Sequence, residues 1–303
     1  MKMTFWFGND MSATAQIVAQ IAVGGLLMGL IYALVAAGLS LIFGLMDVVN
    51  FAHGELLMLA MYAVFVFWSV TGLDPLLLLP AVTLLLFGLG MAIYRGAIAR
   101  ALSVPFNKGM VQIFVTFGLA IFLRGAVQFC FGGEFRSVTN TWLAGRSANL
   151  GGVFVPLPQL AASVVCLLAF AGLLLISRTE FGRALEATRE DREAVALVGI
   201  DRDRIFALGW GLGVAAVGVA GVMLAGFYYV GPNVGASFAL IAFVTVALGG
   251  FGNMFGALVA GVIIGEVEAI TAAVFEPSLK EVGVCVVYLI VLMFRPRGLF
   301  GKA

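Results

Sequence analysis

The stretch QIVAQIAVGGLLMGLIYALVAAGLSLIFGL, residues 16–45, carries no charged side chain and decides the fold class. A helix crosses a bilayer with about 20 mostly apolar residues, so this stretch exceeds the length of one perpendicular span. It also contains Gly24, Gly25, Gly29, Gly38 and Gly44. The excess length and the glycines together predict a membrane helix that is tilted, kinked or interrupted.

Similar apolar runs, separated by charges or by Pro and Gly clusters, continue to the end of the chain. They lie near residues 52–70, 75–94, 111–131, 155–177, 205–230, 237–252, 255–275 and 282–294. The runs 237–252 and 282–294 are shorter than a comfortable span, which is typical of re-entrant or broken elements. The sequence therefore predicts an all-α polytopic membrane protein, one transmembrane domain over residues 1–303 with eight or nine transmembrane helices.

Composition excludes several other classes of protein. Of the 303 residues 62% are apolar and only 11% are charged, whereas globular proteins average about 45–50% and about 25%. A net charge of +1 without a basic face argues against nucleic-acid binding. Cys130, Cys166 and Cys285 are too widely spaced to indicate a metal site or a disulfide framework. With one histidine and no catalytic motif, we expect no catalytic residue, no metal and no enzyme activity.

Basic residues predict the orientation, because short loops rich in Lys and Arg stay in the cytoplasm. They gather in three segments, residues 95–108, 178–204 and 295–302. Nine crossings would place all three on one face, with the N-terminus outside and the C-terminus in the cytoplasm. Residues 132–149 would then face outward.

The segment 178–204 holds 13 of the 33 charged residues, six basic and seven acidic. Phe181, Leu185, Ala194, Leu197 and Val198 recur at helical spacing within it, which predicts one or two short helices on the cytoplasmic face. Such a segment is either a solvated loop or a helix that docks into a groove of another protein.

Two groups of polar residues interrupt the apolar runs. Asp47, Asn50, His53 and Glu55 lie within nine residues, and on a continuous helix the first three would share a face. They indicate either a pathway or gate, or an ordinary interfacial loop. Glu266 and Glu268 in the eighth run indicate a translocation path or a structural hydrogen bond.

Arg124, near the outer end of its run, is interpreted as a snorkelling side chain. Small residues four apart, Gly252 with Gly256, Ala257 with Gly261, and Gly261 with Gly265, predict closely packed helices. The Gly249-Gly250-Phe251-Gly252 block lacks the GxxxxGK[ST] pattern, so it does not indicate a phosphate-binding loop.

Four blocks resemble the permease subunits of branched-chain amino acid ABC transporters, and their first permease type in particular. They are residues 38–44 with Val49-Asn-Phe-Ala-His-Gly-Glu55, residues 182–200, residues 246–258, and the tail Arg295-Pro-Arg-Gly-Leu-Phe-Gly301. The resemblance implies an inner-membrane subunit that works with a second permease, two cytoplasmic ATPases and an external substrate-binding protein. It implies no cofactor on this chain, because the partner subunits use the ATP.

The resemblance also assigns roles to residues. It implies ATPase coupling by Gly182, Arg183, Arg189, Asp191 and Gly199, and a translocation pathway or gate formed by Asn50, His53, Glu55, Gly249, Gly250 and Glu268. Ile241, Phe255 and Glu266 depart from the residues common in the family, and these departures bear on the substrate. The alternatives are a permease for urea or short amides, or an ion-coupled carrier with its own coupling groups.

Overall fold

The computed structural model describes residues 4–104, 107–139, 141–150, 152–190, 194–197 and 199–301. In chain order the elements are α1 (Thr4–Met46), α2 (His53–Thr71), α3 (Pro75–Ile93), the π-helix η1 (Tyr94–Ile98), α4 (Ala99–Ser103), α5 (Lys108–Phe131), β1 (Ser147–Leu150), β2 (Val153–Pro156), α6 (Leu157–Ser177), α7 (Glu180–Glu190), α8 (Ala194–Leu197), α9 (Arg202–Ala225), α10 (Val234–Gly249), α11 (Met254–Val274), the 3₁₀-helix η2 (Pro277–Leu279) and α12 (Lys280–Phe294). Within the described residues, eight helical segments are long and apolar enough to cross a membrane, and α10 is a shorter apolar helix. The prediction of an all-α polytopic membrane protein with eight or nine spans is confirmed.

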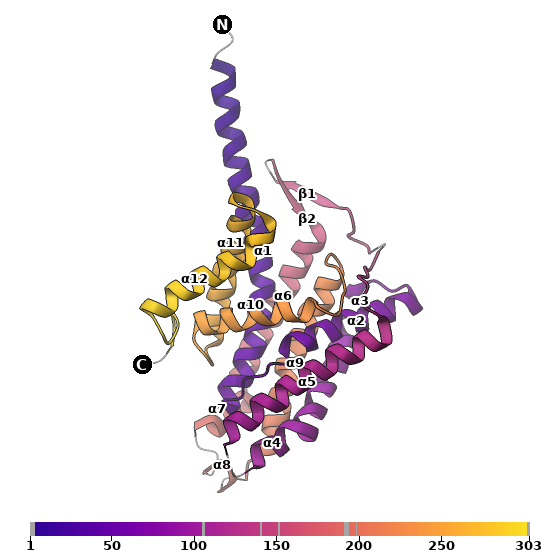
Figure 1. Ribbon diagram of the computed structural model, residues 1–303, viewed down its shortest axis with the longest axis vertical. Helices are drawn as coiled ribbons and strands as arrows, with labels where there is room; N and C mark the ends of the chain where they lie inside the picture. The colour runs from indigo at the N-terminus through magenta and orange to yellow at the C-terminus, as the bar shows by residue number, and fades with distance from the viewer. Residues whose placement is uncertain are drawn as a thin grey trace.

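Helix α1 is continuous from Thr4 to Met46, so the interruption predicted from its glycines is wrong. Its 43 residues extend about 64 Å at 1.5 Å per residue, about twice the thickness of a bilayer core. Figure 1 shows its first turns standing clear of the other helices. Gly25, Gly29 and Gly38 lie against α11 or α9, and Gly44 lies against the turn at Gly252, whereas Gly24 has open space around it.

A short β-hairpin, which the sequence analysis did not anticipate, packs on the projecting part of α1. Strands β1 and β2 pair antiparallel, with Ala148 opposite Val155. The Gln20 side chain accepts a hydrogen bond from the backbone nitrogen of Phe154 (2.8 Å) and donates one to the Phe154 carbonyl oxygen (2.7 Å). These two bonds join β2 to α1 at what we call the hairpin end of the molecule (Figure 1).

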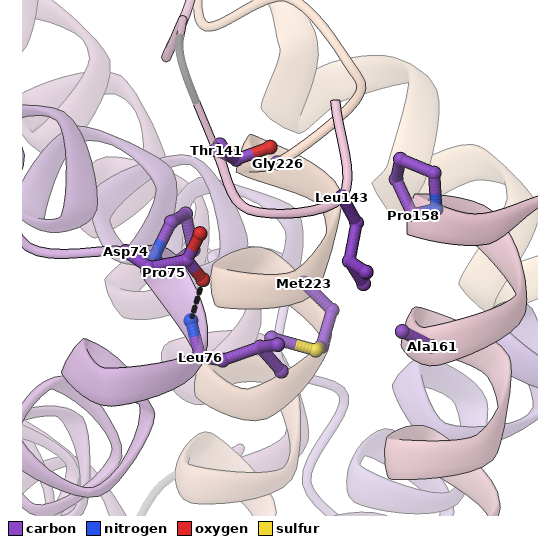
Figure 2. Close-up of a pocket in the computed structure, with 9 residues that line it drawn as sticks. All are labelled: Asp74, Pro75, Leu76, Thr141, Leu143, Pro158, Ala161, Met223 and Gly226. Atoms are coloured by element: carbon purple, nitrogen blue, oxygen red, sulfur yellow. Dashed lines mark hydrogen bonds between the residues drawn. The ribbon is translucent and has the colours of Figure 1, made fainter. Parts of the chain in front are cut away.

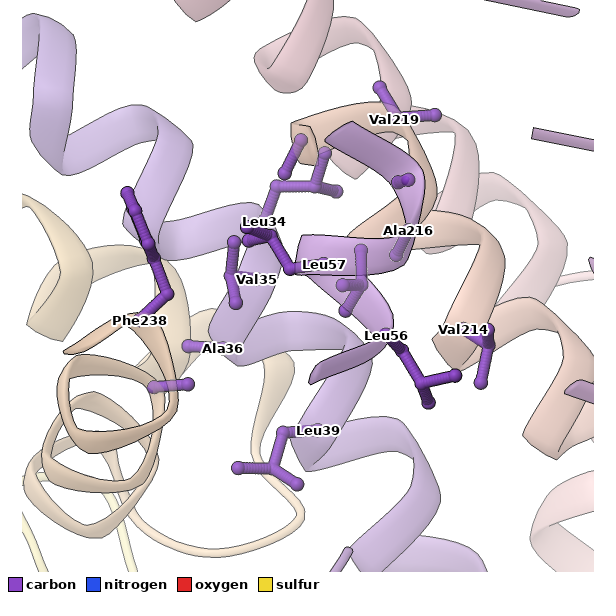
Figure 3. Packing of buried hydrophobic residues seen from close by; sticks show 14 of the residues in the cluster. Leu34, Val35, Ala36, Leu39, Leu56, Leu57, Val214, Ala216, Val219 and Phe238 are labelled. Atoms are coloured by element: carbon purple, nitrogen blue, oxygen red, sulfur yellow. The ribbon is translucent and has the colours of Figure 1, made fainter. Parts of the chain in front are cut away.

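Helix α9 lies at the centre of the bundle and contacts α1, α2, α3 and α6. Figure 3 shows the core where Leu34 and Leu39 of α1, Leu56 of α2 and Val214 of α9 meet. Glycines permit this approach: a Cβ atom added at Gly213 would lie 2.7 Å from the carbonyl oxygen of Gly38.

The small residues Gly261 and Gly265 pack α11 against α1, while Gly256 packs against Gly249 of α10. A Cβ atom at Gly261 would lie 2.6 Å from Ala33 Cα, and one at Gly265 would lie 2.5 Å from Gly29 Cα. Lipid tails are as apolar as the helix surfaces, so the hydrophobic effect does not drive helices together within a bilayer. Backbones this close instead gain many dispersion contacts, which stabilise the helix pair. The close packing predicted from the spacing is confirmed.

The three basic segments gather on the side away from the hairpin. Helices α4, α7 and α8 lie together at what we call the basic end, opposite β1 and β2 (Figure 1). The C-terminal tail packs against the turn at Gly250, and the same turn approaches Arg189 of α7 through Gly252. The grouping of basic segments that the charge pattern predicts is therefore present.

Candidate functional site

The chain between α1 and α2 is non-helical and returns into the bundle. Helix α1 ends at Met46, where Asp47 adopts a left-handed conformation with φ 55°. His53, the first residue of α2, has its Nε2 atom 2.9 Å from the carbonyl oxygen of Val35. Val35 and Met46 are about 16 Å apart along α1 at 1.5 Å per residue. Residues 47–52 therefore carry the chain back to membrane depth before α2 begins.

Asn50 organises this segment and is itself completely buried. Its side-chain oxygen accepts from the backbone nitrogen of Ala52 (3.1 Å), and its carbonyl oxygen accepts from that of His53 (3.2 Å). Residues 47–50 are not helical, so the shared face that a continuous helix would give Asp47, Asn50 and His53 does not form. Since the Val35 carbonyl can only accept, His53 carries its proton on Nε2.

Helix α5 supplies polar side chains to this non-helical backbone. The Gln112 side-chain nitrogen donates to the Asp47 carbonyl oxygen (3.0 Å). The Thr116 hydroxyl lies 3.1 Å from the Val49 carbonyl oxygen and 3.0 Å from that of Gln112 in its own helix. Irregular backbone is tolerated at membrane depth only where protein groups satisfy it, so α5 stabilises the break.

Two helical turns further along α5, Arg124 binds Glu55 of α2. Its Nε atom donates to Glu55 Oε1 at 3.1 Å, and its Nη2 atom donates to the same oxygen. Glu55 is 2% exposed, whereas the Arg124 side chain is 38% exposed. The interpretation of Arg124 as a snorkelling side chain is therefore wrong: it neutralises a buried carboxylate and ties α5 to α2.

The short helix α10 begins against this ion pair. A Cβ atom at Gly235 would lie 2.6 Å from Glu55 Oε2 and 2.8 Å from the Gly54 carbonyl oxygen. Among the described residues Oε2 has no hydrogen-bond partner. Carboxylates are favourable near a helix N-terminus, where the partial charge is positive. Glu55 therefore lies where α10 can respond to a change in its charge.

A second ion pair joins α11 to α12, two helices that both contact α10. Glu268 of α11 accepts from Lys280 Nζ at 2.8 Å and is 8% exposed. Tyr32 of α1 is an electrostatic neighbour of Glu268. The Tyr32 ring packs edge-on against Phe238 of α10, with 6.0 Å between the ring centroids. Glu266 is only half-buried and lies against Gly25 of α1.

The far end of α10 forms a joint with the C-terminal tail. The backbone nitrogens of Leu299 and Phe300 donate to the carbonyl oxygens of Leu248 (2.7 Å) and Gly249 (3.3 Å). Gly250 has φ 99°, and a Cβ atom there would lie 2.8 Å from the Gly301 nitrogen. Gly249 and Gly250 thus lie at the basic end, where the tail packs against them.

Helix α7 connects this joint to the surface. Gly182 is buried, and a Cβ atom there would clash with the Ser177 carbonyl at the end of α6. Leu185 packs into the bundle near Gly209, while Arg183 is exposed and pairs with Glu180.

The remaining coupling residues fall in the last turn of α7 or after it. Arg189 Nη2 would be 3.4 Å from a Cβ atom at Gly252. Gly199 follows α8 with φ 82°. Asp191 lies outside the described residues. A cleft of about 230 Å³ separates α7 from α1, lined by Ser40, Gly44, Leu185, Arg189 and Gly252 among others.

At the hairpin end a smaller cavity, of about 30 Å³, has room for about one water molecule. Asp74 borders it: its Oδ1 atom accepts from the Leu76 nitrogen (2.9 Å, Figure 2), which caps α3, and its Oδ2 atom accepts from the Trp142 nitrogen (2.7 Å). The cavity is too small for an amino acid, and Asp74 holds the loop in place.

The structure thus places the candidate pathway residues around one short helix. Glu55 meets its first turn, Glu268 lies close to Tyr32 beside its Phe238, and Gly249 ends it. The sequence motifs did not indicate Gln112, Thr116 or Lys280, and the ion-pairing role of Arg124 differs from the snorkelling role predicted for it. A signal was present, because Gln112, Thr116 and Arg124 fall at multiples of four residues within an apolar run.

A bundle of apolar helices with a broken segment and paired charges at membrane depth defines a multi-pass membrane transport protein. Residues 21–294 match the family model for the permease component of branched-chain amino acid transport systems. The chain therefore belongs to this family of ABC transporter permeases, whose bacterial members are inner-membrane proteins and are not themselves catalytic.

Curated relatives align along nearly the whole chain. It is 32% identical over 292 residues to the high-affinity branched-chain amino acid permease BraD of Pseudomonas aeruginosa, covering 92% of this chain and 94% of that protein. It is 30% identical over 288 residues to the LivH permeases of Salmonella typhimurium and of Escherichia coli, with the same coverage. The resemblance seen in the sequence motifs is confirmed.

Proposed function

We propose that this chain imports branched-chain or related hydrophobic amino acids as one of two similar permeases in an ABC transporter. In this assembly two ATPases bind the basic end, and an external binding protein delivers substrate at the hairpin end. The N-terminus is then outside and the C-terminus is cytoplasmic. ATP is bound and hydrolysed by the ATPases, and no cofactor binds this chain.

The geometry of α7 is the observation that carries the proposal. Its Leu185 is buried against the bundle, whereas Arg183 and Glu180 point outward with side chains 66% and 93% exposed. An amphipathic helix fixed on one side and charged on the other can be gripped by another protein. The cleft between α7 and α1 leaves room for α7 to move when it is pushed.

The contacts also provide a route from α7 to the candidate pathway. Arg189 lies against Gly252, which is in the turn between α10 and α11, and the tail holds this turn. Movement of α7 would therefore reach the C-terminal end of α10. The N-terminal end of α10 lies against Glu55, where the broken segment meets α2. Alternating access would follow from tilting α10 between these two anchored ends.

An ion-coupled carrier is the competing function, and the ion pairs argue against it. Such a carrier needs intramembrane groups that gain and lose a cation. Glu55 and Glu268 are each paired with a basic side chain, Arg124 and Lys280.

The test is charge reversal on α7, with uptake measured in proteoliposomes that contain the permeases, the ATPases and the binding protein. Arg183→Glu should abolish ATP-dependent uptake of leucine and weaken retention of the ATPases during purification. Arg146→Glu is the matched control for ATPase retention alone, which it should leave unchanged, because Arg146 is exposed at the opposite, hairpin end. Full uptake by the Arg183→Glu transporter, or uptake without ATPases, would contradict the proposal. Competition by valine, urea or acetamide would identify the substrate class.

A further inference from the structure

An apolar groove of about 290 Å³ opens between α2, α3 and α5, away from the α10 region. Leu59, Tyr62 and Phe67 line it from α2, Leu85 and Leu89 from α3, and Phe131 from α5. These residues belong to membrane-spanning segments. From Leu59 to Phe67 the groove extends about 12 Å along α2 at 1.5 Å per residue, close to half of a bilayer core about 30 Å thick.

A cationic group lies beside the groove at its Phe131 end. The Arg136 guanidinium carbon is 5.2 Å from the centroid of the Phe65 ring and 5.7 Å from that of Phe131, which lines the groove. Two backbone hydrogen bonds with Val230, of 2.8 and 2.7 Å, fix the position of Arg136. Its Nη2 atom donates to the Phe131 carbonyl oxygen (2.8 Å). The guanidinium is thus held in one place next to the groove.

Two polar atoms at this place have no partner in the described part of the chain. They are Arg136 Nε and the Tyr62 hydroxyl, and both are buried. Buried polar groups are nearly always hydrogen-bonded, so each orphaned atom calls for a missing partner. A partner that satisfies both must present an acceptor beside a chain of apolar atoms.

We propose that this groove binds an anionic phospholipid. One acyl chain would lie between α2, α3 and α5, and the phosphodiester would accept hydrogen bonds from Arg136 and Tyr62. Charge complementarity favours this occupant, because Arg136 offers a fixed positive charge that a neutral apolar segment of a partner protein would not use. Bound lipid would fill the space between α5 and α3 and stabilise α5 against α2.

The experiment is native mass spectrometry of the full-length chain in mild detergent, titrated with palmitoyl-oleoyl phosphatidylglycerol. Phosphatidylcholine with the same acyl chains serves as the neutral probe. One phosphatidylglycerol should bind in preference to phosphatidylcholine. Arg136→Gln should weaken that binding about tenfold, the loss expected for one charge-assisted hydrogen bond.

Ala63→Trp places an indole in the groove and should abolish the bound phosphatidylglycerol. Leu168→Trp is its matched control, because Leu168 is 66% exposed on α6, away from the groove. Melting of each variant without added lipid, compared with that of the parent chain, shows whether it is folded. Equal binding of both lipids, or unchanged phosphatidylglycerol binding by both groove variants, would overturn the proposal. A third outcome would also overturn the proposal. If the parent chain binds no lipid and Ala63→Trp loses its contact with the second permease, the occupant of the groove is a protein.

Discussion

The Glu55–Arg124 pair offers a quantitative test, because only one of its partners is fully buried. Arg124→Gln removes the positive charge and both hydrogen bonds to Glu55 Oε1. Breaking a buried ion pair by removing one partner costs about 3–5 kcal/mol. Glu55 is 2% exposed but can relieve its charge by taking up a proton, and Arg124 is 38% exposed, so we expect the lower end, about 3 kcal/mol.

The reverse change should cost less. Glu55→Gln leaves a half-exposed arginine that can extend towards the bilayer surface, so about 1 kcal/mol is expected. The double variant Glu55→Gln/Arg124→Gln leaves no unpaired charge and should also lose about 1 kcal/mol. The single losses sum to about 4 kcal/mol, so the pair would show a coupling energy of about 3 kcal/mol.

Thermal unfolding in detergent, followed by size-exclusion chromatography of the heated protein, measures these differences. For a chain of this length, a loss of about 3 kcal/mol corresponds to a fall in Tm of about 5 °C. Gln128→Ala, an exposed change on the same helix, controls for effects on α5 itself. The reasoning is refuted if the double variant melts as low as Arg124→Gln, because the unpaired charge would then not be the cause.

Three further predictions concern stability. Gly265→Ala should lower the free energy of unfolding by about 2 kcal/mol or more, because the methyl group would meet Gly29 Cα at 2.5 Å. Gly118→Ala has open space around it and should be neutral or stabilising. Thermal melting of the two variants compares these effects. Asp74→Ala should lower the free energy of unfolding by about 1–2 kcal/mol, because α3 loses its N-terminal cap. It should also speed protease cleavage of the loop at Trp142, which Asp74 binds. An unchanged cleavage rate would show that Asp74 does not hold the loop. Gly250→Ala should cost about 1–3 kcal/mol, because φ is 99° and the Gly301 nitrogen is close; a Tm equal to that of the parent would contradict this.

The fold class was predictable from the sequence because hydropathy and charge act locally. Long uncharged runs must lie in lipid, so the spans and the grouping of the three basic segments followed from the order of apolar and charged residues along the chain. The small-residue spacing of residues 252–265 correctly predicted close packing. It could not identify α1 as the partner helix, because the pattern describes one helix face and not the surface opposite it.

The candidate site was predictable only in part. Asp47, Asn50, His53 and Glu55 stood out as polar residues between apolar runs, but Asp47 and Asn50 are not helical and share no helix face with His53. A break at Asp47 is stabilised by hydrogen bonds from Gln112 and Thr116, more than 60 positions away. No local pattern around Asp47 contains those donors.

The sequence by itself determined that this chain is a membrane protein, that its basic segments gather together, and which transporter family its motifs indicate. Each of these depends on residue type and on spacing along the chain. Only the tertiary structure decided which charges neutralise each other, which groups contact the two ends of α10, and that the glycines of α1 do not interrupt the helix. Pairing and close approach are properties of surfaces from distant segments, and those surfaces meet only when the chain has folded.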